Sequence, residues 1–346
     1  MIIAGPVGRL WGIENERIFM TSREAVRRAL CFEEVEKIPV ENGFGGELQK
    51  KYPSDVAAPP YHYPQGKSRG EANKRGFRTD IWGCIWEAGE DGVCGEVKDS
   101  PLRNGWSGLK FFTPPWEVIK GADLTSVNPA CDSSEKFMLS KWDSMPNPFE
   151  RMQYLRGTEN LLVDLACLEP EICVLRDMIH DYFMKQMQMW VNTNVDGVQI
   201  ADDWGAQQSL LISPGLWRTF FKPLYKDYCD LAHAHGKYVL MHSDGYIVDI
   251  IPDLIEIGVD AINAQLFCMP IEDLAERFSG RICFWGEIDR QWLLTRATTN
   301  EVREAVRRVA AAFLKKKRTG VVGQCSWGKD HRIENCEAVY DEWSKV

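Results

Sequence analysis

The residues after an apolar run near the middle of the chain could carry out chemistry. Tyr238–Met241 (YVLM) has the composition of a buried strand, and His242, Ser243, Asp244 and Gly245 follow it directly. An imidazole and a carboxylate placed at the end of a buried strand can bind a metal ion or move a proton. We therefore predict that this stretch forms part of a functional site, and that Gly245 allows the chain to turn there.

Polar side chains follow four other predicted strands as well. These strands are Gly197–Ala201, Ala261–Ala264, Ile282–Trp285 and Val321–Gly323, and the residues after them include Asp202, Asp203, Gln265, Glu287, Asp289 and Cys325. Imidazole, thiolate and carboxylate groups converging from different strands suit zinc, which takes N, S and O ligands. The candidate ligands are His242, Glu287 and Cys325, with Asp244 as a further one.

Each of these residues also has an ordinary structural interpretation. A histidine at the edge of a sheet can be a hydrogen-bonded structural residue, and a cysteine can simply be packed in the core. Asp202 or Asp203 can cap the loop in which it lies. It is their occurrence together, at successive strand ends, that favours a functional site.

The elements that position these residues alternate strictly in the second half of the chain. Helical periodicity is seen in Pro148–Arg156, Glu171–Val191, Pro214–His235, Ile247–Ile257, Ile271–Phe278, Asn300–Lys315 and from about Ile333 onward. Alternating strands and helices with short loops predict a parallel sheet. The number of units favours an α/β (β/α)8 TIM barrel over a doubly wound sheet, and no GxGxxG motif follows any strand.

The first part of the chain is less regular. Residues 1–20 are predicted to be an N-terminal arm, followed by a capped helix (SREAVRRAL, Ser22–Leu30) and a strand at Lys37–Val40. Residues 45–135, rich in proline, glycine and aromatics, are predicted to be an ordered insertion or lid with a hairpin strand at Asp80–Trp86. We expect one barrel domain spanning residues 1–346.

Composition narrows the function classes. The chain has 346 residues and a net charge of −9, which argues against nucleic-acid binding. Its 11 cysteines contain no CxxC pair, as expected in a reducing compartment. No apolar run approaches the length of a membrane span, so we expect a cytoplasmic protein without membrane association. Its 13 tryptophans indicate either an aromatic-walled pocket or large core residues.

Most of the chain resembles the uroporphyrinogen decarboxylase superfamily, in its cobalamin-dependent methyltransferase branch. The resemblance rests on SREAVRRAL and Lys37–Val40, on TDIWGC (Thr79–Cys84) and DDWGAQ (Asp202–Gln207), and most specifically on HSDG (His242–Gly245), FWGEID (Phe284–Asp289) and Cys325 followed by Glu334 and Asn335. It implies a (β/α)8 barrel.

The resemblance separates two branches. The decarboxylases use no metal and bind propionates with an arginine-rich segment near the N-terminus. The N-terminal stretch Glu41–Tyr52 of this chain contains no arginine. The methyltransferases bind zinc through a His-x-Cys pair and a later cysteine. This chain has His242 and Cys325, but Asp244 stands at the middle position. Oxygen ligands leave zinc a harder Lewis acid, which favours an ether or hydroxyl substrate over a thiol.

The resemblance thus implies a methyltransferase of the O-demethylase type. It would move a methyl group from a methoxylated, aromatic compound to the cobalt of a separate corrinoid protein, because the chain lacks a corrinoid-binding DxHxxG motif. Zinc would polarise the ether oxygen, and Asp202, Asp203 or Asp289 would orient the substrate or manage its proton. Trp82, Trp204 and Gln265 are expected to contact the substrate.

Three alternatives stay open at this point. One is a uroporphyrinogen decarboxylase. Another is transfer in the reverse direction, from a methylated corrinoid protein to a thiol or a folate. The third is a non-catalytic barrel that binds a ligand. The sequence leaves the oligomeric state open, a homodimer included.

Overall fold

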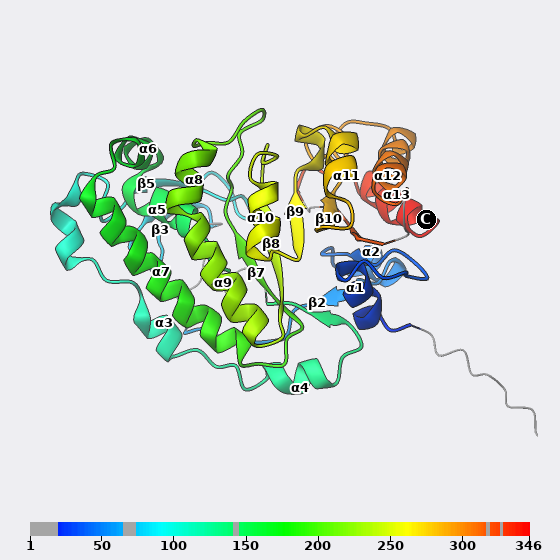
Figure 1. Ribbon diagram of the computed structural model, residues 1–346, viewed down its shortest axis with the longest axis horizontal. Coiled ribbons are helices and arrows are strands. Elements are labelled where there is room, and N and C mark those ends of the chain that lie inside the picture. The colour runs from blue at the N-terminus through cyan, green and yellow to red at the C-terminus, as the bar shows by residue number, and fades with distance from the viewer. Residues whose placement is uncertain (1–19, 65–73, 141–144, 316–318, 326–327) are drawn as a thin grey trace, which may run out of the picture.

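Six parallel strands form the central sheet of the protein. The computed structural model describes residues 20–64, 74–140, 145–315, 319–325 and 328–346. The sheet has the order β1–β11–β10–β9–β8–β7, and it curls into a half-barrel (Figure 1). Its strands are β1 (Val40–Glu41), β7 (Gly197–Ala201), β8 (Tyr238–Ser243), β9 (Ala261–Ala264), β10 (Cys283–Glu287) and β11 (Val321–Gln324). The predicted α/β class and parallel sheet are therefore confirmed.

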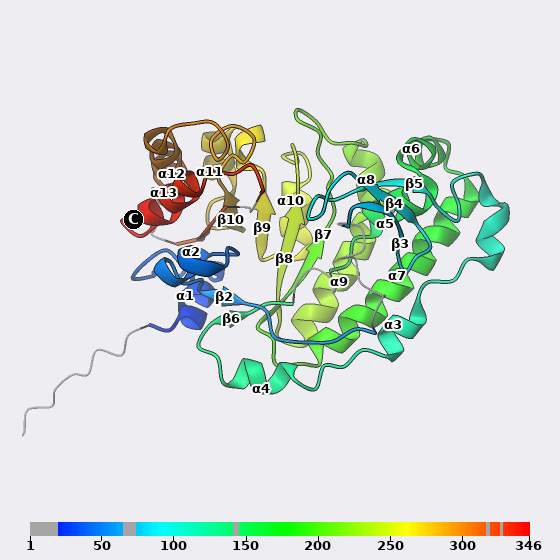
Figure 2. The ribbon, with the colours of Figure 1, turned by 180° about the vertical axis from the view of Figure 1, so that it is seen from behind.

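Helices alternate with these strands along the chain, as their periodicity predicts. They are α1 (Ser22–Leu30), α7 (Pro170–Val191), α8 (Pro214–Phe220), α9 (Lys222–Ala234), α10 (Ile251–Ile257), α11 (Ile271–Phe278), α12 (Thr299–Phe313) and α13 (Ile333–Trp343). Seen from the two sides, α7, α9 and α10 cover the outer face of β7 and β8 (Figures 1 and 2). Each buries one apolar stripe against the strands, which is the packing that an amphipathic helix requires.

Apart from shifts of one or two residues at helix ends, two predicted helices differ from the structure. The single helix expected at Pro214–His235 is two helices that meet at Phe221. The missing N–H of Pro223 is tolerated only in a first helical turn, so a new helix starts there. The helix expected to begin at Ile247 begins at Ile251, and Pro252 again lies in its first turn.

The insertion before residue 136 contains structure of its own. Its elements are α2 (Gly46–Lys51), β2 (Val56–Ala57), β3 (Gly76–Thr79), β4 (Ile85–Ala88), β5 (Glu96–Asp99), the 3-10 helix η2 (Trp106–Phe111), α3 (Trp116–Lys120) and α4 (Val127–Asp132). Strands β3–β5 form an antiparallel sheet. The strand predicted at Asp80–Trp86 is wrong in its first half, because Asp80 Oδ1 accepts hydrogen bonds from Trp82 N and Cys84 N and makes a turn there.

Short strands β2 and β6 (Phe137–Met138) form a second parallel sheet between the edges of the large one. Asp55 N, just before β2, donates to Val40 O of β1 at 2.8 Å. Leu139, just after β6, bridges to Gly197 of β7 in parallel orientation. The remaining elements are α5 (Pro148–Arg156), α6 (Thr158–Cys167) and the 3-10 helix η4 (Leu266–Cys268).

The core of the protein takes up most of the large aromatic side chains. The largest fully buried side chains include Trp190, Trp204, Trp217, Trp285 and Trp343. These tryptophans serve as core residues, one of the two interpretations that the composition allowed. Among the described helices, none is long and apolar enough to cross a lipid bilayer. Of the arm predicted at residues 1–20, residues 1–19 lie outside the described part.

The register of the parallel strands brings their carboxyl ends to one edge. Ala201 of β7 pairs with His242 of β8, and His242 pairs with Asn263 of β9. Glu287, the last residue of β10, pairs with Gln324 of β11. Polar residues that are far apart in sequence therefore meet at the same edge.

Candidate functional site at the carboxyl ends of the strands

Two acids and a histidine gather at this edge. The ligand atoms of Asp203, His242 and Asp244 all lie within 4.8 Å of one another. His242 Nε2 is 3.7 Å from Asp203 Oδ1 and 3.6 Å from Asp244 Oδ1. Asp203 comes from the loop after β7. Strand β8 ends at Ser243. His242 lies on the same inner face of the curled sheet as Leu240, and Asp244, two positions later on the chain, returns to that side.

The orientation of His242 is set by Asn263. His242 Nδ1 lies 2.6 Å from Asn263 Oδ1, and Asn263 Nδ2 donates to the Trp285 carbonyl at 2.7 Å. Because the amide nitrogen of Asn263 is used by that carbonyl, its oxygen faces the imidazole and accepts the Nδ1 proton. The lone pair of Nε2 is then directed toward Asp203 and Asp244, as in histidines that bind metals.

The charges around His242 favour its protonated form when no cation is present. Burial acts to lower the pKa of this imidazole, but the carboxylates of Asp244 and Asp203, the hydrogen bond with Asn263 and the charge of Glu287 together outweigh burial, and the pKa is raised above its usual value. The same two carboxylates that attract a proton would attract a metal ion in its place. A proton and a cation thus compete for this position.

Two glycines let the loops after β7 and β8 come into contact. Gly245 has a φ of +78°, and a Cβ on it would overlap the carbonyl of Gly205. The loops are joined by Gly205 N donating to Asp244 O at 3.0 Å and by Asp244 N donating to Asp203 Oδ1 at 3.0 Å. Gly245 N donates to Gln265 Oε1 at 2.9 Å. The predicted turn at Gly245 is confirmed, and it fixes Asp244 beside Asp203.

The residues of this group fit a divalent metal ion. Asp244 Oδ1 is buried and has no hydrogen-bond partner, although it faces His242 Nε2. A buried carboxylate oxygen without a partner is costly, and a bound cation would satisfy it. The donor set is one imidazole nitrogen and carboxylate oxygens, which zinc accepts and which makes the ion a hard Lewis acid.

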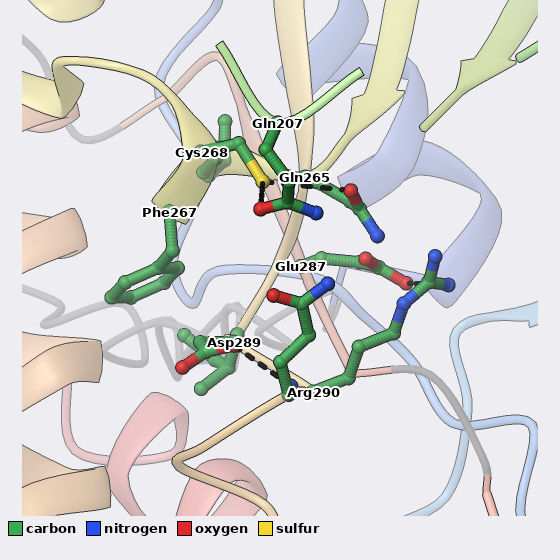
Figure 3. Close-up of a pocket in the computed structure, with 10 residues that line it drawn as sticks. Gln207, Gln265, Phe267, Cys268, Glu287, Asp289 and Arg290 are labelled. Atoms are coloured by element: carbon green, nitrogen blue, oxygen red, sulfur yellow. Dashed lines mark hydrogen bonds and ion pairs between the residues drawn. The ribbon is translucent and has the colours of Figure 1, made fainter. Parts of the chain in front are cut away.

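A pocket opens next to the group, on the side of β9 and β10. Its empty space amounts to about 430 Å³, part of which is open solvent. Its lining residues are Gln207, Gln265, Leu266, Phe267, Cys268, Glu287, Ile288, Asp289, Arg290 and Gln291 (Figure 3). Leu266, Phe267 and Ile288 supply apolar surface, and glutamine amides supply hydrogen-bonding groups. This combination suits a small molecule with an apolar ring and polar substituents.

Arg290 links the pocket to the acidic group. One of its guanidinium nitrogens, Nη2, pairs with Asp244 Oδ2, and the other, Nη1, lies 3.6 Å from Glu287 Oε1. Glu287 itself is buried, with 5% of its side chain exposed. Figure 3 shows the Arg290 side chain running across the pocket toward Glu287. The predicted ligand Glu287 therefore lies beside the group, where it contacts an arginine.

Cys325 is not among the residues whose ligand atoms gather within 4.8 Å of one another. Its thiol is buried and shares a hydrogen bond with Cys336 of α13. Burial, and then this bond, raise the pKa of Cys325 well above the usual value, whereas the same bond and His331 lower the pKa of Cys336 to about 6. The two thiols therefore titrate as a pair. The role of Cys325 as a zinc ligand stays a prediction.

Asp202, a predicted catalytic acid, is directed into the protein. It is fully buried, and its carboxylate accepts hydrogen bonds from Phe149 N at 3.0 Å, Glu150 N at 2.7 Å and Tyr225 Oη at 2.5 Å. Burial and the charge of Glu150 raise its pKa well above the usual value, against these hydrogen bonds. Asp202 thus holds the first turn of α5 in the way a helix cap does.

The aromatic residues predicted to contact substrate pack elsewhere. Trp204 stacks on Phe149 with ring centroids 4.1 Å apart, and Trp82 lies 4.7 Å from Tyr182 of α7. Neither lines the pocket, where the aromatic surface comes from Phe267. Gln265 and Asp289 do line it, and their predicted roles toward a substrate stay predictions. Asp289 Oδ1 also accepts from Gln291 N at 2.8 Å, which orders the loop after β10.

Asn263 and Arg290 belong to the candidate site but were not identified from the sequence pattern. Asn263 is an amide inside the short apolar strand β9 (AINA), and that interruption was the available signal. Arg290 follows Asp289 in a loop, and its type alone does not separate it from surface arginines.

The fold and the site define a class: a parallel α/β half-barrel with a polar group and a pocket at the carboxyl ends of its strands, where enzymes of this architecture act. A sequence profile described as Uroporphyrinogen decarboxylase (URO-D) matches residues 145–345, more than half of the chain. The chain therefore belongs to the uroporphyrinogen decarboxylase family. Among curated proteins, none matches the sequence significantly.

Similar solved structures were also found. A "methyltransferase from Methanosarcina mazei" superposes with a TM-score of 0.69 at 14% identity, covering 94% of this chain and 99% of that one. At this identity the likeness establishes a shared fold. Two other structures are too distant to support an argument. One is a D-psicose 3-epimerase, with a TM-score of 0.33 and 8% identity over 63% of this chain and 88% of that one. The other is a sugar phosphate isomerase/epimerase from Parabacteroides distasonis, with a TM-score of 0.30 and 9% identity over 47% of this chain and 62% of that one.

Proposed function

We propose that the protein is a zinc-dependent methyltransferase that removes the methyl group of a methoxylated aromatic compound and passes it to the cobalt of a separate corrinoid protein. The family membership and the fold shared with a methyltransferase support the general class. The contacts joining β2 and β6 to β1 and β7 support a complete (β/α)8 barrel around the site.

The observation that carries the proposal is the position of Asp244. It stands where the methyltransferases that this chain resembles have a thiolate. Its buried Oδ1 lacks a partner and faces His242 Nε2, and Asp203 completes an oxygen-rich group. We infer that Asp203, His242 and Asp244 hold zinc. Bound there, zinc would supply a Lewis acid suited to an ether oxygen and to the negative charge of a departing phenolate.

The protein's own residues would bind and orient the substrate. Leu266, Phe267 and Ile288 offer an apolar wall for an aromatic ring, next to the group that would face the ether oxygen. The amides of Gln207 and Gln265 can bind ring substituents that contain oxygen. In the reaction the methyl–oxygen bond breaks, the electron pair of reduced cobalt forms the new bond to carbon, and the phenolate takes a proton. Asp289 lines the same solvent-open pocket and can pass that proton from water to the phenolate.

The test measures methyl transfer directly. Protein loaded with zinc is incubated with a methoxylated aromatic acid and reduced cobalamin, and the loss of the reduced cobalamin spectrum is followed together with release of the phenol. We expect transfer that chelation abolishes and added zinc restores, and that His242→Gln removes. Full activity in His242→Gln, or no transfer from any aryl methyl ether, would refute the proposal.

Protein with His233→Gln provides a matched control. His233 is a histidine on the outside of the sheet whose ring contacts Asp260 at 2.9 Å, far in the fold from the group. It should retain full transfer activity. Incubation with uroporphyrinogen tests the decarboxylase alternative in the same preparation, and we expect no decarboxylation because Glu41–Tyr52 contains no arginine.

A further inference from the structure

Arg290 occupies two environments at once. Its guanidinium pairs with Asp244 and lies 3.6 Å from Glu287, while its side chain lines the pocket and is 29% exposed. A side chain of this length with this exposure can move without unfolding its surroundings. Figure 3 shows the Arg290 guanidinium beside Glu287.

Asp244 cannot serve Arg290 and a metal ion equally. Its Oδ2 is taken by Arg290, and its Oδ1, buried and without a partner, faces His242. A divalent cation held by Asp203, His242 and Asp244 would stand close to the guanidinium, and two positive groups at such a separation repel strongly in a partly buried site. A bound ion would therefore weaken the pairing of Arg290 with Asp244.

The pocket offers Arg290 a second position. The amides of Gln207, Gln265 and Gln291 line the same space. Gln265 Oε1 already accepts from Gly245 N, so the groups that it and Arg290 can turn toward a ligand are N–H donors. Donors of this kind beside an apolar wall suit a carboxylate on an aromatic ring, and arginine binds carboxylates with two parallel hydrogen bonds.

We propose that Arg290 couples occupancy of the metal group to binding of an aromatic carboxylate in the pocket. With neither bound, Arg290 neutralises Asp244. When the ion binds, its charge repels the guanidinium, which turns into the pocket and binds the carboxylate. When the carboxylate binds first, it draws Arg290 from Asp244 Oδ2 and removes the positive charge beside the position of the ion. The inference rests on the proposed metal site, and it assigns the substrate class as methoxylated aromatic acids.

The coupling is measured as a change in zinc affinity. The Kd for zinc is determined by competition with a coloured chelator, without and with saturating benzoate, which has no methyl group to transfer. Coupling free energies between sites commonly correspond to about 5–150-fold changes in affinity. We expect benzoate to tighten zinc binding by about tenfold in the wild-type protein and, by reciprocity, zinc to tighten benzoate binding by the same factor. Benzamide, which is uncharged, should have no effect.

Variants separate this role from direct contact of benzoate with zinc. Arg290→Gln should bind zinc more tightly than the wild type in the absence of benzoate and should lose the benzoate effect. Arg290→Lys keeps the positive charge and should retain part of the benzoate effect. Arg303→Gln is the matched control, because Arg303 pairs with Asp341 and Glu342 between α12 and α13. It should behave as the wild type.

Three results would overturn the inference. They are a benzoate effect that persists in Arg290→Gln, no benzoate effect in the wild type, and no zinc binding at all. The first two leave the proposed methyl transfer intact if aryl methyl ethers are still demethylated. Conversely, coupling through Arg290 without any methyl transfer would support the inference and refute the proposed function.

Discussion

Replacing Asn263 tests whether His242 is held as a metal ligand. Asn263→Ala removes the oxygen that accepts the His242 Nδ1 proton, at 2.6 Å, and the N–H that satisfies the Trp285 carbonyl, at 2.7 Å. Without the acceptor, the imidazole can rotate or change tautomer, and its Nε2 lone pair is no longer fixed toward Asp203 and Asp244. The variant should bind zinc more weakly while all three proposed ligands are still present.

The size of the effect follows from the geometry. Loss of the partner that orients a ligating histidine costs about 10–100-fold in metal affinity, which corresponds to about 1.4–2.8 kcal/mol. Asn263 is 7% exposed, so its removal also leaves the Trp285 carbonyl buried without a donor. That loss should lower the free energy of unfolding by about 1–3 kcal/mol.

The assay is zinc competition with a coloured chelator, combined with urea unfolding of the metal-free protein. Asn263→Asp keeps an acceptor oxygen for His242 and should recover zinc affinity relative to Asn263→Ala. Asn42→Ala is the control, since Asn42 is 2% exposed and donates to the Tyr52 carbonyl at 2.8 Å away from the group. It should lose stability but keep zinc affinity. Wild-type zinc affinity in Asn263→Ala would refute the reasoning.

Three further changes separate site geometry from stability. Gly245→Ala places a side chain at a φ of +78° and against the Gly205 carbonyl, so it should lower the free energy of unfolding by about 1–3 kcal/mol and weaken zinc binding. Urea unfolding and chelator competition measure these two effects. Zinc affinity equal to the wild type would contradict the role of that turn. Asp202→Ala should lower the free energy of unfolding by at least about 2 kcal/mol, because three hydrogen-bond donors lose their acceptor. The folded variant should bind zinc as tightly as the wild type. A selective loss of methyl transfer in a stable protein would instead indicate a catalytic role for Asp202. The hydrogen bond with Asp260 raises the pKa of His233, so the stabilisation from this pair is fully present below the unfolded-state pKa of about 6.5 and is lost as the pH rises through the folded-state pKa. Because both side chains are partly exposed, His233→Gln should lower the free energy of unfolding in urea by at most about 1 kcal/mol at pH 5.5 and not at all at pH 9. An equal loss at both pH values would show that the ion pair is not the cause.

The sequence predicted the elements wherever one local signal dominated. Short β-branched strands and amphipathic helices alternate after residue 136, and Gly197–Ala201, Ala261–Ala264 and Ile271–Phe278 have the predicted bounds. The signals failed where a side chain or a proline acts locally. Asp80 makes a turn inside an apparently alternating stretch, and Pro223 starts a new helix inside a continuous helical pattern.

The site was predictable in position but only partly in composition. Strand ends in a parallel sheet share one edge, so His242, Asp244 and Asp203 could be expected together. The sequence does not predict the direction of the Asp202 side chain, because neighbouring residues in a loop have no fixed periodicity. In the structure Asp202 is turned toward α5 and Asp203 toward His242. Asn263 and Arg290 act through partners that are distant in sequence, and a single sequence does not reveal such pairings.

X-ray absorption at the zinc edge tests the central claim most directly. The protein, loaded with one equivalent of zinc, is compared with Asp244→Cys, in which a thiolate replaces the carboxylate. We predict that wild-type zinc is surrounded by nitrogen and oxygen at about 2.0–2.2 Å, one of them from histidine, with no sulfur at about 2.3 Å, whereas Asp244→Cys gains a sulfur. A sulfur neighbour in the wild-type protein would place a thiolate such as Cys325 in the centre and contradict the oxygen-rich site on which the proposed ether substrate depends.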